Sequence, residues 1–214
     1  MRTPPAPKPH SKARLPLRLV ALAAPLLVAC APPMGFRPAM PMLPGQHNEV
    51  GAGVSLGGEL FPHEGRTHEI GLGGAVGGGG QAWFYHQFAR FFDLGGIAWA
   101  STYNQAGAGL SLRFRIVNTE PFVLGFEVTG GIAFAEGAFP LAARLSDRVW
   151  LYMAPGAGIV AGGNAVAALP VARIPLGLSI RVSDHWLLMA EAQPQIFFFT
   201  QTIVTGGFGF AYRF

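Results

Sequence analysis

From Glu49 to residue 214, apolar side chains recur at every second position, which is the pattern of β-strands with one apolar face. In the stretch 49–60, Val, Ala and Leu occupy most even positions, and Gly, Ser and Glu occupy the odd ones. The alternation returns in the stretches 110–116, 122–129, 173–182, 186–195 and 207–214. The sequence therefore predicts an all-β fold.

The composition of the two faces indicates which all-β fold this is. Alternation is typical both of soluble barrels or sandwiches, with the apolar face inside, and of membrane barrels, with it outside. Here the face opposite the large apolar residues is mostly Gly, Ala and Ser with isolated Arg and Glu, and residues 31–214 contain no Lys. Only 12% of the chain is charged, whereas soluble domains carry about 25%. Because small residues suit the crowded interior of a narrow barrel, we predict a closed antiparallel transmembrane β-barrel.

Turn-forming residues divide the pattern into strands. Asn, Asp, Ser or Pro occur between alternating runs at 92–94, 118–121, 146–148 and 183–185, which we interpret as periplasmic turns. The other connections then lie near 61–66, 103–106, 135–138, 161–168 and 199–204. Ten strands result, at about 49–60, 66–91, 94–103, 106–117, 121–134, 138–145, 148–160, 169–182, 185–198 and 204–214. Eight strands result if 66–91, which is too long for one strand and is interrupted by Gly77–Gly80, or 138–145 is a loop. We prefer ten. Either even number places both ends of the barrel in the periplasm.

Residues 1–29 have the order of a secretory signal. Basic residues and prolines come first, then an apolar stretch at 15–29 that ends in small residues. Of the 15 basic residues, five precede residue 30; the other ten are Arg, and all 11 acidic residues also lie beyond it, which leaves that region a charge of −1. Because the basicity belongs to the signal, we expect no nucleic-acid partner.

The stretch Leu27-Val28-Ala29-Cys30 resembles the lipobox of bacterial lipoproteins. The resemblance implies cleavage before Cys30, acylation of its sulfur with palmitate-type chains and acylation of its new amine. It also implies export to the outer membrane, because residue 31 is Ala and not Asp. A plain signal peptide with an incidental cysteine is the alternative. We expect three parts: a signal peptide (1–29), a lipidated Cys30 with a Pro-rich tether (30–47), whose lipid reaches the inner leaflet, and a barrel (48–214).

The last strand ends in alternating aromatic residues. This pattern resembles the terminal signal that the barrel assembly machinery of the outer membrane recognises. The residues that carry it are Phe208, Phe210, Tyr212 and Phe214.

Ten charged residues fall on the face expected to point inward, five acids and five arginines. They are Glu49, Glu59, Glu69, Arg113, Arg115, Glu127, Arg144, Arg173, Arg181 and Glu191. Charges in a narrow lumen need partners, because an unpaired charge away from water is very costly. We therefore expect a paired network that plugs the lumen and disfavours an open pore. The alternative is that Arg173 and Arg181 line an anion path.

Evidence for enzymatic or metal chemistry is weak. His63, Glu64, His68 and Glu69 lie in or near the first expected outer loop, and His86 lies among aromatic residues, but no nucleophile arrangement or tight ligand spacing is present. Gly77–Gly80 lacks the Lys-Ser/Thr of a phosphate loop. We expect no cofactor and no metal. The nearby aromatic cluster is interpreted as an interfacial girdle: Trp83, Phe84, Tyr85, Phe88, Phe91 and Phe92.

These features together predict an outer-membrane β-barrel lipoprotein with a structural or interaction role in the cell envelope. Its expected partners are membrane lipids and the barrel assembly machinery, with other envelope proteins left open. A barrel enzyme acting on envelope lipid or peptide and a narrow solute channel are the alternatives.

Overall fold

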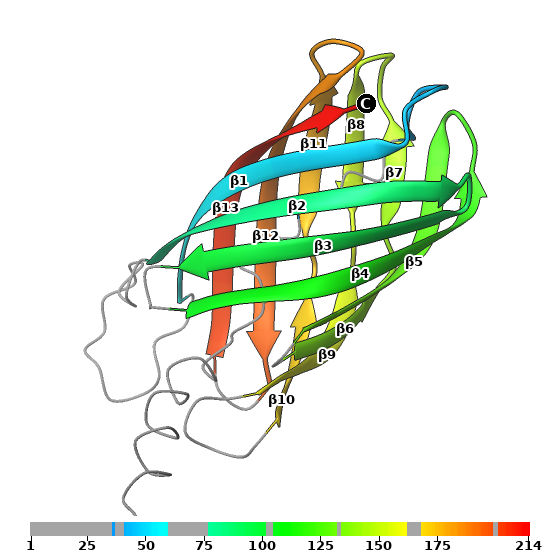
Figure 1. Ribbon diagram of the computed structural model, residues 1–214. Helices are drawn as coiled ribbons and strands as arrows, with labels where there is room; N and C mark the ends of the chain where they lie inside the picture. Colours follow the sequence, from blue (N-terminus) through cyan, green and yellow to red (C-terminus); the bar gives the residue numbers. More distant parts are fainter. Residues whose placement is uncertain are drawn as a thin grey trace, which may run out of the picture.

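The computed structural model describes residues 36, 41–59, 77–101, 105–131, 134–161, 168–198 and 201–214. These residues form one antiparallel sheet that closes on itself (Figure 1). Its strand segments are β1 (Asn48–Glu59), β2 (Gly77–Ala89), β3 (Phe92–Ser101), β4 (Gln105–Asn118), β5 (Phe122–Gly131), β6 (Phe134–Ala138), β7 (Leu141–Arg144), β8 (Val149–Met153), β9 (Gly156–Ala161), β10 (Ala168–Arg173), β11 (Leu176–Arg181), β12 (Trp186–Phe197) and β13 (Gln201–Arg213).

No helix among the described residues is both long enough and apolar enough to cross a bilayer.

Three pairs of segments are interrupted halves of single strands. β6 and β7 both pair with β5, and β10 and β11 both pair with β12. β8 and β9 lie between these two pairs, because β8 contacts β7 and β11 while β9 contacts β6 and β10. The wall therefore has ten strands, which confirms the preferred strand count. β1 and β13 close it over a continuous register from Glu49–Arg213 to Glu59–Ile203.

The interruptions occur at prolines that stand side by side in adjacent strands. The carbonyl of Pro155 accepts a hydrogen bond from Phe139, the carbonyl of Pro175 accepts one from Ala154, and the carbonyl of Pro194 accepts one from Ile174. Pro140 continues this row, because its carbonyl accepts a hydrogen bond from Gly125 in β5. A proline has no N–H to donate, so each proline of the row leaves its strand without one backbone hydrogen-bond donor. The row explains why three strands are split in two.

The two ends of the barrel differ. Short connections join β2 to β3, β4 to β5, β7 to β8 and β11 to β12 at one end, where Asn48 and Arg213 also lie. We call this end the turn end and the opposite end the loop end. Three of the four turns occur where the sequence predicts them, and the first lies at 90–91 instead of 92–94, because residues 92–94 already pair with β4. Short turns are typical of the periplasmic side of such barrels.

Two further boundaries differ from the sequence prediction. Gly77–Gly80 begin β2 and pair with β1, so they do not interrupt the strand, and residues 60–76 lie outside the described residues. Residues 135–138, predicted as a loop, belong to β6 and pair with β5. Both errors have the same cause: Gly and Ala carry too little apolar side chain to make the alternation visible, although the backbone pairing continues through them.

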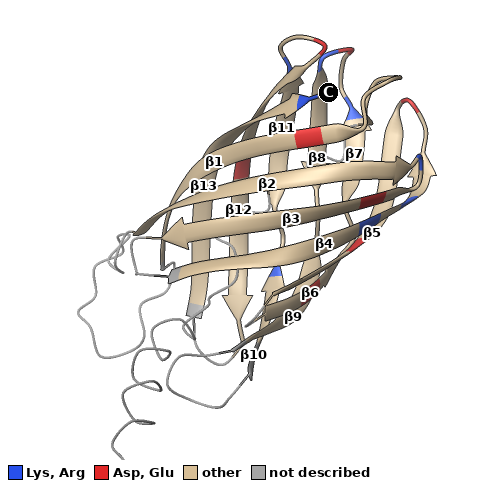
Figure 2. Cartoon of the chain, in the orientation of Figure 1, with Lys and Arg blue, Asp and Glu red and all other residues tan. Residues whose placement is uncertain are grey.

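Large apolar side chains cover the outer face of the wall. Leu110 and Phe208 are 69% and 71% exposed, and similar residues recur along every long strand. Few positions of the strands are occupied by charged residues (Figure 2). Apolar surface of this extent is unsuited to water and suited to acyl chains. A closed barrel also pairs its strand backbone internally, as the bilayer interior requires.

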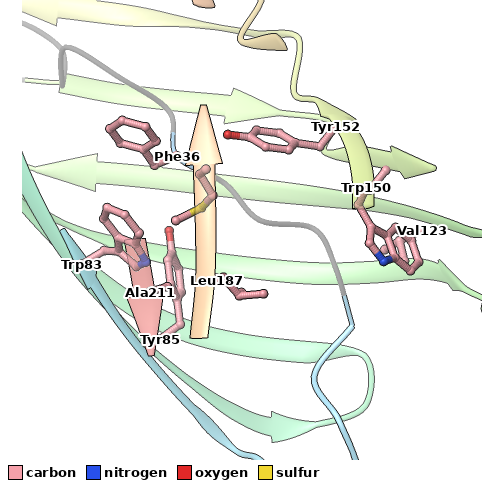
Figure 3. Packing of buried hydrophobic residues seen from close by; sticks show 10 residues of the cluster. Phe36, Trp83, Tyr85, Val123, Trp150, Tyr152, Leu187 and Ala211 are labelled. Carbon is pink, nitrogen blue, oxygen red and sulfur yellow. The ribbon is translucent and has the colours of Figure 1, made fainter. Parts of the chain in front are cut away.

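Aromatic side chains fill part of the inside (Figure 3). Trp83 and Tyr85, at 3% exposure, point into the barrel, whereas their neighbours Phe84, Phe88 and Phe91 are exposed on the outside. The expectation that the whole 83–92 cluster forms an interfacial girdle is therefore wrong for Trp83 and Tyr85. Their alternation within β2 places them on the same face as Gln81.

Each of these rings lies over a glycine of the neighbouring strand. Trp83 is paired directly with Gly51, and Tyr85 with Gly95. A Cβ at either glycine would overlap the ring. Trp99–Gly107 and Tyr152–Gly177 repeat the arrangement. The glycines thus make room for rings that lie against the wall.

Candidate functional site: the ionic network of the lumen

Nine charged side chains are buried on the inward face of the barrel, and together we call them the lumen network. They are Glu49, Asp93, Arg113, Arg115, Glu127, Glu136, Arg173, Glu191 and Arg213. Their strand positions follow from alternation, because each lies two or four residues from another inward residue of the same strand. Buried charges persist only when paired and hydrogen-bonded. Their contacts therefore define what the lumen can do.

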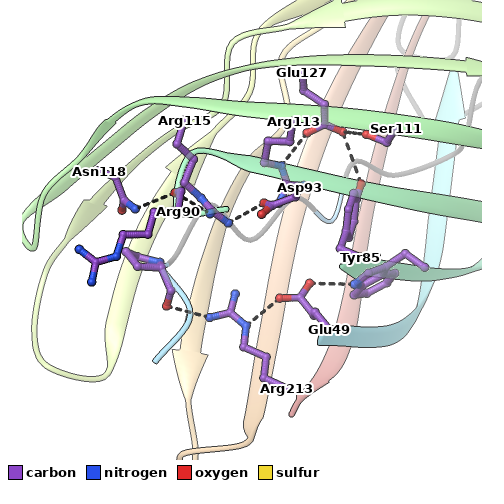
Figure 4. Close-up of polar contacts among 12 residues, drawn as sticks. Glu49, Tyr85, Arg90, Asp93, Ser111, Arg113, Arg115, Asn118, Glu127 and Arg213 are labelled. Carbon is purple, nitrogen blue, oxygen red and sulfur yellow. Dashed lines mark hydrogen bonds and ion pairs between the residues drawn. The ribbon is translucent and has the colours of Figure 1, made fainter. Parts of the chain in front are cut away.

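One cluster of the network spans β3, β4 and β5 (Figure 4). Arg113 Nε lies 3.1 Å from Glu127 Oε2, in the directly paired strand β5. Arg115 Nη2 lies 2.5 Å from Asp93 Oδ2 on β3, and Arg113 Nη1 lies 3.9 Å from the same oxygen. Two arginines and two carboxylates thus alternate across three neighbouring strands.

Neutral groups complete the shell around Glu127. Ser111 Oγ donates to Glu127 Oε1 at 2.7 Å, and Thr129 Oγ1 and the Tyr85 hydroxyl approach the same oxygen at 3.2 and 3.4 Å. The Arg113 guanidinium also lies 4.4 Å from the centroid of the Tyr85 ring, within the range of a cation–π interaction. These contacts fix the position of the Glu127 carboxylate.

A second cluster closes the barrel at the seam between β1 and β13. Arg213 Nε donates to Glu49 Oε2 at 2.7 Å, and Trp83 Nε1 donates to Glu49 Oε1 at 3.1 Å. Arg213 Nη1 also donates to the carbonyl of Pro41 at 3.1 Å. The pair therefore joins the first strand, the last strand and the segment before β1.

The opposite wall carries two further contacts. Arg173 on β10 forms an ion pair with Glu136 on β6. The Tyr152 hydroxyl on β8 donates to Glu191 Oε2 on β12 at 2.8 Å. Neither contact joins directly paired strands, because β9 lies between β6 and β10, and β11 lies between β8 and β12. These side chains reach past a neighbouring strand.

The structure places six of the ten predicted charged residues inside: Glu49, Arg113, Arg115, Glu127, Arg173 and Glu191. Arg181 is half-buried at the last position of β11. Arg144 lies at the rim of the turn end, where it pairs with Asp147 and, at 3.3 Å, with Glu120, both exposed. Glu59 ends β1, but its side chain lies outside the described part, as does all of Glu69.

Three members of the network are absent from the predicted set. Asp93 is read as a turn residue in the sequence and Glu136 as a loop residue, yet both occupy inward strand positions. Arg213 is visible as the inward neighbour of Tyr212 and Phe214, and its partner Glu49 lies at the far end of the barrel sequence. Extending the alternation of Gly95 and Trp99 back by one step would have included Asp93.

The residues considered for other roles are placed as follows. Phe208, Phe210 and Phe214 face outward, and Phe214 exchanges backbone hydrogen bonds with Asn48 at 2.8 and 3.0 Å. His86 Nδ1 lies 2.8 Å from Asn48 Oδ1 at the turn end.

The predicted outer-loop residues His63, Glu64 and His68, and the lipobox residue Cys30, lie outside the described residues. Among the residues that are described, no group of three or more His, Cys, Asp or Glu side chains is arranged to hold a metal ion.

The segment before β1 contacts the barrel from within. The Phe36 side chain is 1% exposed and stacks on Trp83, with ring centroids 5.6 Å apart. At the turn end, Gln46 Nε2 donates to the carbonyl of Asp184 at 2.7 Å. The His47 N–H donates to the carbonyl of Phe214 at 3.0 Å. The sequence contains no periodic signal that could have predicted these contacts.

A closed wall with an apolar outside and a polar, ion-paired inside defines the class of protein. Such walls belong to transmembrane β-barrels of the outer-membrane type. The chain is therefore an outer-membrane β-barrel.

Comparisons with known proteins were made at three levels. No family model matches the chain, and no curated protein matches it. Among solved structures, the translocator domain of the autotransporter NalP from Neisseria meningitidis is similar, with 13% identity, a TM-score of 0.49, and coverage of 79% of this chain and 89% of that one. Ail, the attachment invasion locus protein of Yersinia pestis, has 14% identity, a TM-score of 0.38, and coverage of 79% and 97%. A KdgM porin in complex with disordered oligogalacturonate has 11% identity, a TM-score of 0.42, and coverage of 78% and 99%. Because these identities and TM-scores are low, the assignment of the chain to the outer-membrane β-barrels rests on its own apolar outer face and ion-paired interior.

Proposed function

We propose that this protein is a lipid-anchored outer-membrane barrel with a structural or interaction role in the bacterial envelope, and that the lumen network closes it to solutes. The lipid is assigned to Cys30, on the basis of the lipobox resemblance. The barrel provides a rigid membrane anchor, and among the described residues its short turns and lipid-facing wall offer contact surfaces to other envelope components.

The observation that supports closure is the pairing of opposite charges on the inner face of the wall. Arg113 contacts Glu127 and Asp93, Arg213 contacts Glu49, and Arg173 contacts Glu136. A channel for anions or cations needs charges that are open to the passing ion, whereas paired charges neutralise each other. The partners lie on neighbouring strands, or on strands one apart, and their side chains point inward, so they also occupy part of the space inside the barrel.

Planar-bilayer recording tests closure. We expect the wild-type barrel to give no stable ion conductance. The double variant Arg113→Ala/Glu127→Ala removes both partners of one pair, so it leaves neither charge alone, and we expect it to conduct. Arg144→Ala, at the exposed rim, is the matched control and should behave like the wild type. Steady conductance of the wild type would favour the solute-channel alternative and overturn closure.

Metabolic labelling tests the anchor separately. Cells grown with radiolabelled palmitate should incorporate label into the wild type and not into Cys30→Ala. Equal labelling of both, or labelling of neither, would overturn the lipid assignment while leaving the barrel intact as a membrane protein.

A further inference from the structure

The inner wall at the seam between β1 and β13 leaves room for one aromatic ring, which is that of Phe36. Gly53 and Gly209 are direct partners across the seam. A Cβ at Gly53 would overlap the Phe36 ring, and one at Gly209 would lie 3.2 Å from it. The indole of Trp83 stacks on the same ring, with centroids 5.6 Å apart and an interplanar angle of 23° (Figure 3). We call the space bounded by Gly53, Gly209 and Trp83 the socket.

The lining of the socket suits an uncharged, flat ring. Each glycine offers only backbone, so a ring can lie directly against the wall. The Trp83 N–H is already engaged, because it donates to Glu49 Oε1 at 3.1 Å, so the indole offers its face to the occupant. Stacked aromatic pairs are favourable beyond the area that they bury. Between backbone and indole, a flat ring fits where a thicker group would not.

Phe36 is also connected to the ion pair that closes the seam. The indole on which it stacks donates to Glu49, and Arg213 Nε donates to the other oxygen of that carboxylate at 2.7 Å (Figure 4). Arg213 Nη1 donates to the carbonyl of Pro41 at 3.1 Å. The chain before β1 therefore contacts the same set of side chains at two positions, Phe36 through Trp83 and Pro41 through Arg213.

The seam is the joint where such contacts matter most. The walls of the socket come from β1, β2 and β13, and β1 and β13 are the first and last strands of the barrel. No turn connects these two strands, and the entropic cost of bringing two segments together rises with the length of chain between them. A ring that contacts both strands stabilises the joint that the turns leave unsupported.

We propose that the socket is a binding site for one uncharged aromatic ring, and that Phe36 is its resident occupant and thereby holds the seam closed. When the Phe36 ring is removed, the site accepts a free ring of the same size, such as benzene, as apolar cavities left by truncated side chains do. This inference goes beyond the proposed function. It depends neither on a lipid at Cys30 nor on closure of the lumen to solutes, and its tests read neither.

A double-mutant cycle tests whether the ring and the glycine compete for one space. In the wild type, Gly53→Ala places a methyl group where the ring lies, so the urea midpoint of unfolding in lipid vesicles should fall. In Phe36→Ala, the same substitution fills part of the emptied socket, and the midpoint should stay or rise. Gly107→Ala, whose Cβ would meet the Trp99 ring, is the matched control and should lower the midpoint equally in both backgrounds.

An equal fall for Gly53→Ala in both backgrounds would overturn the shared space. Heat-modifiable gel mobility establishes that each variant is a folded barrel. If Phe36→Ala does not fold, the cycle is run with Phe36→Leu, which lacks the flat ring and should relieve part of the overlap with a methyl group at residue 53.

Free rings test the chemistry of the site. Phe36→Ala folded into vesicles with benzene should recover a large part of its lost midpoint, whereas cyclohexane, which is thicker, should recover much less. Phe36→Ala/Gly53→Ala, with a methyl group in the socket, should respond weakly. The wild type and Phe88→Ala, which lacks an exposed ring on the outer face, correct for the effect of each solvent on the bilayer. No recovery of Phe36→Ala, or recovery no larger than that of Phe88→Ala, would overturn the ring site.

Amide hydrogen exchange locates the effect within the barrel. In Phe36→Ala, we expect several-fold faster exchange at the paired amides of β1 and β13 and unchanged exchange between β3 and β4, because the seam alone loses its ring. Benzene should restore the protection of the seam. Faster exchange of the same size throughout the wall would show a general loss of stability and would overturn the role of Phe36 at the seam.

Discussion

Trp83 of β2 and Gly51 of β1 are direct cross-strand partners, and the indole occupies the space that a Cβ at residue 51 would need. The same indole donates a hydrogen bond to Glu49, two residues earlier on β1. Its position is therefore fixed on one side by the absence of a side chain and on the other by a carboxylate. The first prediction follows from this relationship.

Gly51→Ala is expected to destabilise the barrel by about 1–3 kcal/mol, the usual cost of overpacking. The ring cannot withdraw without loss of its bond to Glu49. Gly80→Ala is the control, because the nearest atom to its Cβ lies 3.9 Å away. Urea unfolding in lipid vesicles measures both. Equal free energies of unfolding for the two variants would contradict the close approach.

The Arg113–Glu127 pair gives the second prediction. Glu127→Gln leaves a buried arginine without its carboxylate and should cost about 3–5 kcal/mol. The double variant Arg113→Met/Glu127→Leu removes both charges and should recover a large part of that loss, because no charge of the pair remains unpaired. Glu120→Gln, at the exposed rim, should change the free energy of unfolding by less than about 0.5 kcal/mol. A double variant less stable than the single one would contradict the pairing.

The outer face gives the third prediction. Leu112 lies near the middle of β4 and faces outward, and Ile116 lies on the same face closer to the turn end. We expect Leu112→Arg to cost about 2–4 kcal/mol and Ile116→Arg about 0–1 kcal/mol, because the penalty for a charge falls toward the membrane surface. The comparison is made by folding into vesicles. If Ile116→Arg costs more, the membrane midplane does not cross the wall near Leu112.

The last residue gives the fourth prediction. The side chain of Phe214 is exposed, and the contacts with Asn48 are made by its backbone. Phe214→Ser should therefore leave unfolding in vesicles almost unchanged, yet lower the amount of folded barrel in cells, if the assembly machinery reads this side chain. Phe198→Ser, another exposed aromatic position, is the control. Equal cellular yields would argue against the assembly signal.

Much of the fold could be predicted from the sequence because alternation records which face each residue occupies. The outward set, from Val50 to Phe214, and three of the four turns follow directly from it. Alternation cannot be recognised where residues are small, as at Gly77–Gly80 and in β6, because the side chains of Gly and Ala do not distinguish an apolar face from a polar one. Those segments form strands because their backbones pair with neighbouring strands. This pairing depends on the closed wall and cannot be read from any local stretch of sequence.

The ionic network could be predicted only in part. Periodicity assigns Arg113, Arg115 and Glu127 to the inside, but it cannot name their partners. Asp93 looks like a turn residue because it stands at the first positions of β3. The position of Phe36 could not be predicted, because a single residue outside any strand has no periodic context, and its socket exists only when β1, β2 and β13 meet.

The row of prolines has a consequence for how this wall yields. Pro140, Pro155, Pro175 and Pro194 form an oblique line in the wall, with β7, β8 and β11 on its turn-end side and β6, β9 and β10 on its loop-end side. Neighbouring strands are held together by backbone hydrogen bonds. Along this line some of those hydrogen bonds are missing, because proline has no N–H to donate. Local opening of the wall should therefore start along this line and not at the seam between β1 and β13, where the register is continuous.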